Sequence, residues 1–156
     1  MEKLTQLQGK LLEGCIWDSR RRYLYFVDIE KFRIYRMTED HALSCLKLPT
    51  YVSTIVLTKD GRLLAALQDG LYLVDYDAGK TEKQMESGFP PYLRYNDGKC
   101  DPEGRLWVGS MYIDQSVPGA RHGASLFSIR DGQVVQQYPG YTIPNGLDWH
   151  EGLFYH

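Results

Sequence analysis

One pattern occurs four times in this chain of 156 residues. Each copy begins with a short run that we expect to form the innermost strand of a unit. A turn with an acidic residue or glycine follows, and then a second run of apolar and aromatic residues that contains a leucine at a matching position. The four leucines are Leu24, Leu63, Leu106 and Leu153, spaced by 39, 43 and 47 residues. A period of about 40–50 residues with four strands per unit is typical of β-propeller blades. The repeat therefore predicts an all-β chain built from such blades.

The two outer strands of each unit can also be found. We expect them at 32–37 and 42–46, at 70–75 and 81–85, and at 125–129 and 133–138. Asp131-Gly132 is a hairpin signal between the last two. No segment has a helical apolar period. We expect one partial β-propeller domain over 1–156, with blade units of approximately 12–48, 52–87, 94–139 and 143–156.

This division gives three four-stranded blades and the first half of a fourth. Propellers close with about four to eight blades, because closure removes exposed strand edges. A single copy of this chain cannot form a closed propeller. We therefore expect a truncated product, a propeller completed by another chain, or a smaller non-propeller sheet. Four unrelated hairpins in an all-β domain are a further alternative. Exposed blade edges predict self-association.

Composition excludes several classes of partner. Eighteen Lys plus Arg against 20 Asp plus Glu give a net charge of −2, which argues against bulk attraction to nucleic acid or anionic membranes. No apolar run approaches the roughly 18 residues of a membrane span, and residues 1–10 lack a signal-peptide core. Cys15, Cys45 and Cys100 are odd in number and show no CxxC spacing. A reduced, cytoplasmic chain with small buried thiols is therefore expected.

Three of the four units open their inner strand with a polar residue followed by glycine. These pairs are Glu13-Gly14, Asp97-Gly98 and Asn145-Gly146. Glycine permits a tight turn and close approach of a ligand, and carboxylate and amide oxygens suit a hard divalent cation. The same dipeptides are also ordinary turn sequences, and Glu13 alone is compatible with an exposed carboxylate. Their common register within the repeat is what favours a site.

Two further features have a structural and a functional interpretation. Residues 111–122 form the longest segment without a pattern, which suits either a lid over the channel mouth or a plain surface loop. Trp17, Trp107 and Trp149 occupy comparable inner positions. We interpret these three as residues that pack the blades.

Three segments of the chain resemble the senescence marker protein/regucalcin/gluconolactonase family. They are Leu12–Gly14 with Trp17–Asp18 and Tyr25–Ile29, then Arg94–Met111, then Asn145–Trp149. Their order and spacing match the family over nearly the whole chain. The resemblance implies a six-bladed propeller, of which this chain holds about three and a half blades, and hydrolysis of sugar or related lactones.

The resemblance also implies one divalent metal at the propeller axis. In the family, residues that match Glu13 and Asn145 are metal ligands. The third protein ligand is an Asp that also serves as general base, and it comes from a later blade. This catalytic residue is therefore expected beyond the end of the chain. Ca²⁺ is the first choice for the oxygen ligands, and Mg²⁺, Mn²⁺ and Zn²⁺ also suit such a site.

Substrate contacts are implied at three positions. Arg94 and Asn96 match an Arg and an Asn that bind substrate in the family, and Asp114 is the nearest match to an acidic residue that does so from the following loop. The expected function is divalent-metal-dependent hydrolysis of a small-molecule lactone. The alternative is a non-catalytic, truncated propeller segment that binds a metal or a partner.

Overall fold

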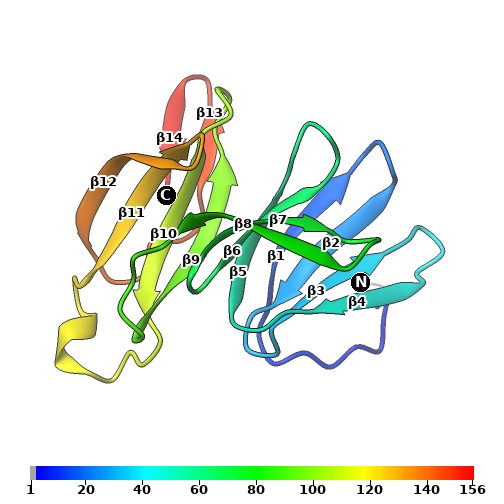
Figure 1. Ribbon diagram of the computed structural model, residues 1–156, viewed down its shortest axis with the longest axis horizontal. Coiled ribbons are helices and arrows are strands. Elements are labelled where there is room, and N and C mark those ends of the chain that lie inside the picture. The colour runs from blue at the N-terminus through cyan, green and yellow to red at the C-terminus, as the bar shows by residue number, and fades with distance from the viewer. Residues whose placement is uncertain (1–2) are drawn as a thin grey trace.

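The computed structural model describes residues 3–156, and Figure 1 shows them as a row of antiparallel sheets. The first sheet contains β1 (Leu12–Asp18), β2 (Tyr23–Asp28), β3 (Arg33–Met37) and β4 (Leu43–Lys47). The second contains β5 (Val52–Leu57), β6 (Leu63–Leu67), β7 (Gly70–Asp75) and β8 (Lys80–Glu86). The third contains β9 (Leu93–Cys100), β10 (Leu106–Tyr112), β11 (Ala124–Arg130) and β12 (Gln133–Tyr141). A two-stranded sheet of β13 (Asp148–His150) and β14 (Leu153–Tyr155) follows.

Within each sheet the strands pair in chain order. The innermost strands of adjacent sheets contact one another, β1 against β5 and β5 against β9. Sequential four-stranded sheets joined through their inner strands are the arrangement of propeller blades. The prediction of an all-β partial propeller is thus confirmed. A short 3-10 helix at Pro118–Ala120 (η1) interrupts the loop between β10 and β11.

Local turn chemistry explains why these hairpins close. Asp131 and Gly132 connect β11 to β12 with φ values of 51° and 71°. Two consecutive positive φ values define the hairpin turn whose twist matches that of the flanking strands, and Asp-Gly is a favoured sequence for it. The hairpin predicted from this dipeptide is confirmed.

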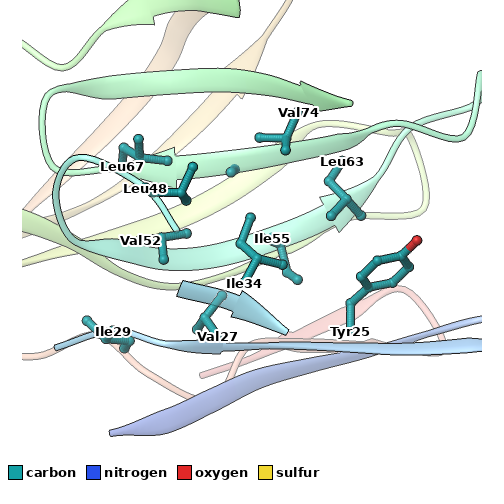
Figure 2. Close-up of a cluster of buried hydrophobic side chains, with 11 residues drawn as sticks. Tyr25, Val27, Ile29, Ile34, Leu48, Val52, Ile55, Leu63, Leu67 and Val74 are labelled. Atoms are coloured by element: carbon teal, nitrogen blue, oxygen red, sulfur yellow. The ribbon is translucent and has the colours of Figure 1, made fainter. Parts of the chain in front are cut away.

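The hydrophobic core lies between the blades. Figure 2 shows the cluster between the first and second sheets, in which side chains from the two sheets face each other. Its members are Tyr25, Val27, Ile29, Ile34, Leu48, Val52, Ile55, Leu63, Ala65, Leu67 and Val74. A second cluster joins the second and third sheets through Val56, Ala66, Leu71, Tyr95, Leu106, Val108, Phe127 and Ile129. Burial of these apolar faces holds each blade against the next.

The aromatic residues of the third and fourth units form another such contact. Trp107, Leu126 and Leu147 are buried, and Trp149 and Phe154 pack against them. The interpretation of tryptophans as packing residues therefore holds for Trp107 and Trp149. It is wrong for Trp17, which is 47% exposed and belongs to none of the hydrophobic clusters among residues 3–156.

The cysteines also differ from the expectation of buried thiols. Cys15 and Cys45 are exposed and Cys100 is half-buried, and all three are free thiols. Burial of the Cys100 thiol, together with the nearby Asp101 carboxylate, raises its pKa. Within the described part of the chain, no helix is long and apolar enough to cross a membrane.

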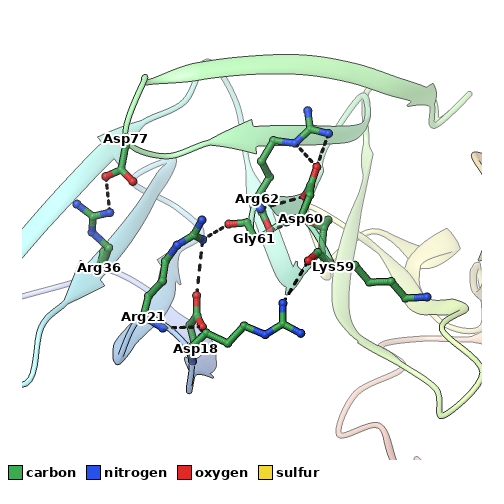
Figure 3. Close-up of polar contacts among 10 residues, drawn as sticks. Asp18, Arg21, Arg36, Lys59, Asp60, Gly61, Arg62 and Asp77 are labelled. Carbon is green, nitrogen blue, oxygen red and sulfur yellow. Dashed lines mark hydrogen bonds and ion pairs between the residues drawn. The ribbon is translucent and has the colours of Figure 1, made fainter.

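Polar contacts also join the first two blades, both at the turns beside their inner strands and further out on the sheets. Arg21 donates to the backbone carbonyl of Gly61 and faces the Asp18 carboxylate at 3.7 Å, as Figure 3 shows. Arg36 in the first sheet pairs with Asp77 of the second at 2.6 Å. These contacts complement the apolar cluster between the same two sheets.

Candidate metal and substrate site

The inner strand of the first sheet contains a one-residue β-bulge beside Glu13. Glu13 pairs with Val27 and Ile16 pairs with Tyr25, so β1 has one more residue than β2 over this interval. Gly14, within the bulge, has a φ of +59°. Bulges redirect side chains and are frequent next to active sites. The Glu13 carboxylate thus projects, exposed to solvent, from an irregular point of the strand.

The inner strands of the other two four-stranded sheets have a bulge as well. In β5 the extra residue falls at Ser53. In β9, Asn96 and Asp97 together lie opposite Gly109 of β10. Each of the three irregularities thus lies at or next to a polar residue of an inner strand. The repeat brings these polar positions, from distant parts of the sequence, onto three adjacent strands.

Arg94 on β9 is buried, with 6% of its surface exposed. Its Nη1 donates to three oxygens, those of Ser53 Oγ at 3.3 Å, the Tyr95 carbonyl at 2.8 Å and Asn96 Oδ1 at 3.4 Å. All three acceptors are neutral. A guanidinium has five N–H donors and is always charged, so Arg94 retains donors for a ligand, and it forms no ion pair with a residue in 3–156.

Burial and neighbouring groups change the pKa of the Arg94 guanidinium. Burial lowers the pKa of the Arg94 guanidinium, while Tyr51 and the Glu13 carboxylate act to raise it. The Arg94 Cζ lies 5.8 Å from the centre of the Tyr51 ring.

Asn96 connects Arg94 to the segment that carries Asn145. Its Oδ1 accepts from Arg94, and its Nδ2 donates to the carbonyl of Pro144 at 3.1 Å. Both Asn96 and Pro144 are buried, whereas the Asn145 side chain is exposed. The structure therefore joins Arg94 and Asn96 directly and places the backbone before Asn145 against them.

The turn around Asn145 has a second attachment to β9. Gly146 donates its backbone N–H to Asp97 Oδ2 at 2.8 Å. Pro144 packs where a side chain at Gly109 would be, because a Cβ there would lie 2.7 Å from the Pro144 Cγ. Asn145 is thus held through both of its neighbours in the chain.

Asp114 is arranged differently from the other predicted residues. It is exposed in the loop after β10, and its Oδ1 accepts from the backbone N–H of Ser116 at 2.9 Å and from the Ser116 hydroxyl at 2.6 Å. These hydrogen bonds lower the pKa of Asp114. No hydrogen bond among the described residues joins it to Arg94 or Asn96, so its substrate role remains a prediction.

Two of the predicted residues offer oxygen ligands of the kind that a divalent cation takes. Glu13 and Asn145 offer a carboxylate and an amide oxygen, and both side chains are exposed. Across residues 3–156, no three His, Cys, Asp or Glu side chains gather in a way that could hold a metal. These two oxygens fit a hard cation that takes its other ligands from water or from further residues.

A hollow of about 370 Å³ lies at the other end of β1 from Glu13. Its lining is Asp18, Ser19, Arg20, Arg21, Leu57, Thr58, Lys59, Asp60 and Gly61. None of the predicted site residues takes part in it. A second hollow of about 250 Å³ is lined by Glu13 together with Leu12, Gly14, Cys15, Leu24 and Phe26.

Sequence reasoning missed two residues of this site. Ser53 and Tyr51 both contact Arg94, but the second unit lacks the polar-glycine pair that marks the other inner strands. The position of Ser53 near the start of its inner strand was the available signal. Asp97 was noticed only as part of a turn dipeptide, and its bond to Gly146 requires the fold.

Comparison with known proteins identifies the family. Residues 11–156 match the model of the SMP-30/Gluconolactonase/LRE-like region. The pentonolactonase XacC of Haloferax volcanii is 32% identical over 149 residues, which are 93% of this chain and 48% of that protein. The 6-deoxy-6-sulfogluconolactonase of Pseudomonas putida is 31% identical over 149 residues, 93% of this chain and 50% of that protein.

A solved structure of similar fold is regucalcin from Agrobacterium tumefaciens, described as a calcium-binding protein. It superposes with a TM-score of 0.83 at 25% identity, covering 92% of this chain and 48% of that one. The chain spans about half the length of the relatives it matches. The resemblance noted in the sequence is confirmed, and the chain belongs to the SMP-30/gluconolactonase/LRE-like family.

Proposed function

We propose that the chain forms part of a divalent-metal-dependent lactonase acting on sugar or related lactones. The observation that carries this proposal is the buried Arg94, whose hydrogen-bond partners Ser53, Tyr95 and Asn96 are all neutral. A buried cation with spare donors is suited to an oxygen-rich ligand that becomes a carboxylate. Two relatives that are lactonases by name support the same chemistry.

In this proposal each residue of the site has a limited task. Arg94 donates to lactone oxygens and to the carboxylate that forms as the ring opens. The amide oxygen of Asn96 accepts from Arg94, and one of its amide N–H groups donates to the Pro144 carbonyl. The second N–H is available to a substrate hydroxyl. Glu13 and Asn145 would hold the cation. When bound, a divalent cation supplies a Lewis acid for the lactone carbonyl.

Hydrolysis adds water to the carbonyl carbon, breaks the ring C–O bond and yields a carboxylate and a hydroxyl. A carboxylate within reach must take the proton of water. The family resemblance implies an Asp of a later blade for this role, and none of the described residues is assigned to it.

Proton release from glucono-δ-lactone and from a pentonolactone tests the proposal. We expect turnover that chelation with EDTA abolishes and that Ca²⁺ or Mn²⁺ restores. The Glu13→Gln and Asn145→Ala variants should raise the cation concentration needed for activity. If the unaltered protein and the two variants need the same cation concentration for activity, the proposed roles of Glu13 and Asn145 are contradicted.

A non-catalytic binding module is the second candidate. It is favoured because neither a third protein ligand for the cation nor a general base is assigned among residues 3–156. Saturable binding of a lactone or aldonate without turnover, at any cation concentration, would support this candidate over the lactonase.

A further inference from the structure

The turn that carries Asn145 is attached on both sides to consecutive residues of β9. Asn96 Nδ2 donates to the carbonyl of Pro144 at 3.1 Å, just before Asn145. Asp97 Oδ2 accepts from the N–H of Gly146 at 2.8 Å, just after it. Residues 144–147 belong to no strand. The conformation of the Asn145 backbone therefore depends on these two contacts.

The bulge in β9 is what allows both contacts. In a regular strand consecutive side chains point to opposite faces of the sheet. Asn96 and Asp97 instead share a place opposite Gly109, and both reach the same turn. An extra residue at a bulge redirects a side chain in this way.

The Asp97 carboxylate is fixed at both of its oxygens. Oδ1 accepts from the backbone N–H of Gly98 at 2.9 Å, and Oδ2 accepts from Gly146. Hydrogen bonds from N–H groups to an ionised carboxylate are stronger than bonds between neutral groups. The half-buried Asp97 is thus anchored to its own strand while it holds a turn 49 residues further along the chain.

We propose that Asp97 is a positioning residue for the metal ligand Asn145. The inference rests on the proposed function, in which Asn145 holds a divalent cation. Asp97 fixes the peptide that follows Asn145, and this fixes the direction in which the amide oxygen of Asn145 is presented. Residues that orient metal ligands typically change metal affinity about 10–100-fold when they are replaced.

The test measures cation binding rather than activity. Mn²⁺ binding is titrated by electron paramagnetic resonance of the free ion, and Ca²⁺ binding by calorimetry, in the protein and in Asp97→Asn, Asp97→Glu and Asn145→Ala variants. Asp148→Asn is the matched control, because it removes one carboxylate next to the same turn, where Asp148 is exposed and pairs with Lys99 at 2.8 Å. Thermal melts of every variant show whether the fold is retained.

A second measurement needs no metal. Asp97→Asn keeps the size of the side chain but leaves only one oxygen for two backbone N–H groups. We expect the Gly146 amide, followed by nuclear magnetic resonance, to exchange its hydrogen faster in this variant. The same amide should stay protected in Asp148→Asn.

The expected result is a 10–100-fold loss of cation affinity in Asp97→Asn at an unchanged melting temperature, against less than about threefold in Asp148→Asn. Asp97→Glu keeps the charge but displaces the carboxylate, so it should bind as weakly as Asp97→Asn. Restored affinity in Asp97→Glu would show that charge alone matters and would overturn the inference.

The failures of the inference and of the proposed function are distinguishable. If Asn145→Ala weakens binding while Asp97→Asn binds as the unaltered protein does, the inference fails and the proposed function stands. If the protein binds no cation, or if Asn145→Ala binds normally, the metal role of Asn145 fails and the inference fails with it. Should Asp97→Asn not fold, Asp97→Glu and the Gly146 exchange rate decide between the same outcomes.

Discussion

Trp107 donates its indole N–H to the Asp101 carboxylate over 3.0 Å, and both side chains are buried. Asp101 also accepts from the backbone N–H groups of Glu103 and Arg105 and from Arg105 Nε. One carboxylate thus closes the turn between β9 and β10 and satisfies the only donor of a core tryptophan. Asp101 is therefore a structural residue of this turn.

Replacement of Asp101 by Ala should lower the free energy of unfolding by about 2–3 kcal/mol, because it leaves several buried N–H donors without an acceptor. Urea unfolding followed by tryptophan fluorescence measures this change. Glu103→Ala is the control, since Glu103 is exposed and forms only a surface ion pair with Arg105 at 3.1 Å, which is worth about 0–1 kcal/mol. Similar losses in the two variants would contradict the role assigned to Asp101.

Acid should weaken the fold partly through the same residue. Burial acts to raise the pKa of Asp101, but hydrogen bonds from Trp107 and Arg105 outweigh it, and the pKa is lowered overall. A folded-state pKa below the unfolded value means that the unfolded chain takes up the proton first as pH falls. The stabilisation is therefore complete above about pH 4 and is lost below it.

This dependence can be measured as melting temperature against pH. We expect a decline below about pH 4 that is shallower in Asp101→Asn, whose side chain does not titrate. An identical slope in the two proteins would show that other carboxylates account for the acid sensitivity.

Arg94 should show opposite effects on stability and on binding. Burial opposes its charge, and its acceptors are neutral. Burial of a charge without an ion-pair partner costs free energy, so Arg94→Met should melt at the same temperature or higher. Its KM for a lactone should rise about 10–100-fold, through the loss of hydrogen bonds to a charged group worth about 1.5–3 kcal/mol.

Arg130→Met is the control for this prediction. Arg130 is exposed and donates to the backbone carbonyl of Glu103 at 3.1 Å, far along the sheet from Arg94. Its replacement should leave KM unchanged. A strong drop in the melting temperature of Arg94→Met would show that the protein compensates this charge in the absence of substrate.

Gly109 should not tolerate even one added methyl group. A Cβ at this position would lie 2.7 Å from the Pro144 Cγ and 2.9 Å from the Pro144 carbonyl oxygen. Gly109→Ala is expected to cost about 1–3 kcal/mol, as overpacking does, and to shift the turn that carries Asn145. Gly119→Ala is the matched control, because its Cβ would meet nothing closer than 3.4 Å. Equal melting temperatures would contradict this account.

Local chemistry made the hairpins predictable. The Asp131-Gly132 turn, the strand Gly70–Asp75 and the strand Leu153–Tyr155 have the expected positions, because turn residues and alternating apolar residues act over a few positions. The start of β9 was not predictable in the same way. The inner strand of this unit was expected to open at Asp97-Gly98, but β9 begins at Leu93. Its first half carries Arg94 and Asn96, two polar residues that are buried in the fold.

The sequence by itself determined the repeat, the all-β class and the family, because each follows from the order of residues along the chain. The tertiary structure alone decided which polar residues meet. The hydrogen bonds from Arg94 to Ser53, from Asn96 to Pro144 and from Gly146 to Asp97 join segments that are 41, 48 and 49 residues apart. Such contacts depend on how one blade packs against the next, and no local pattern in the sequence records that packing.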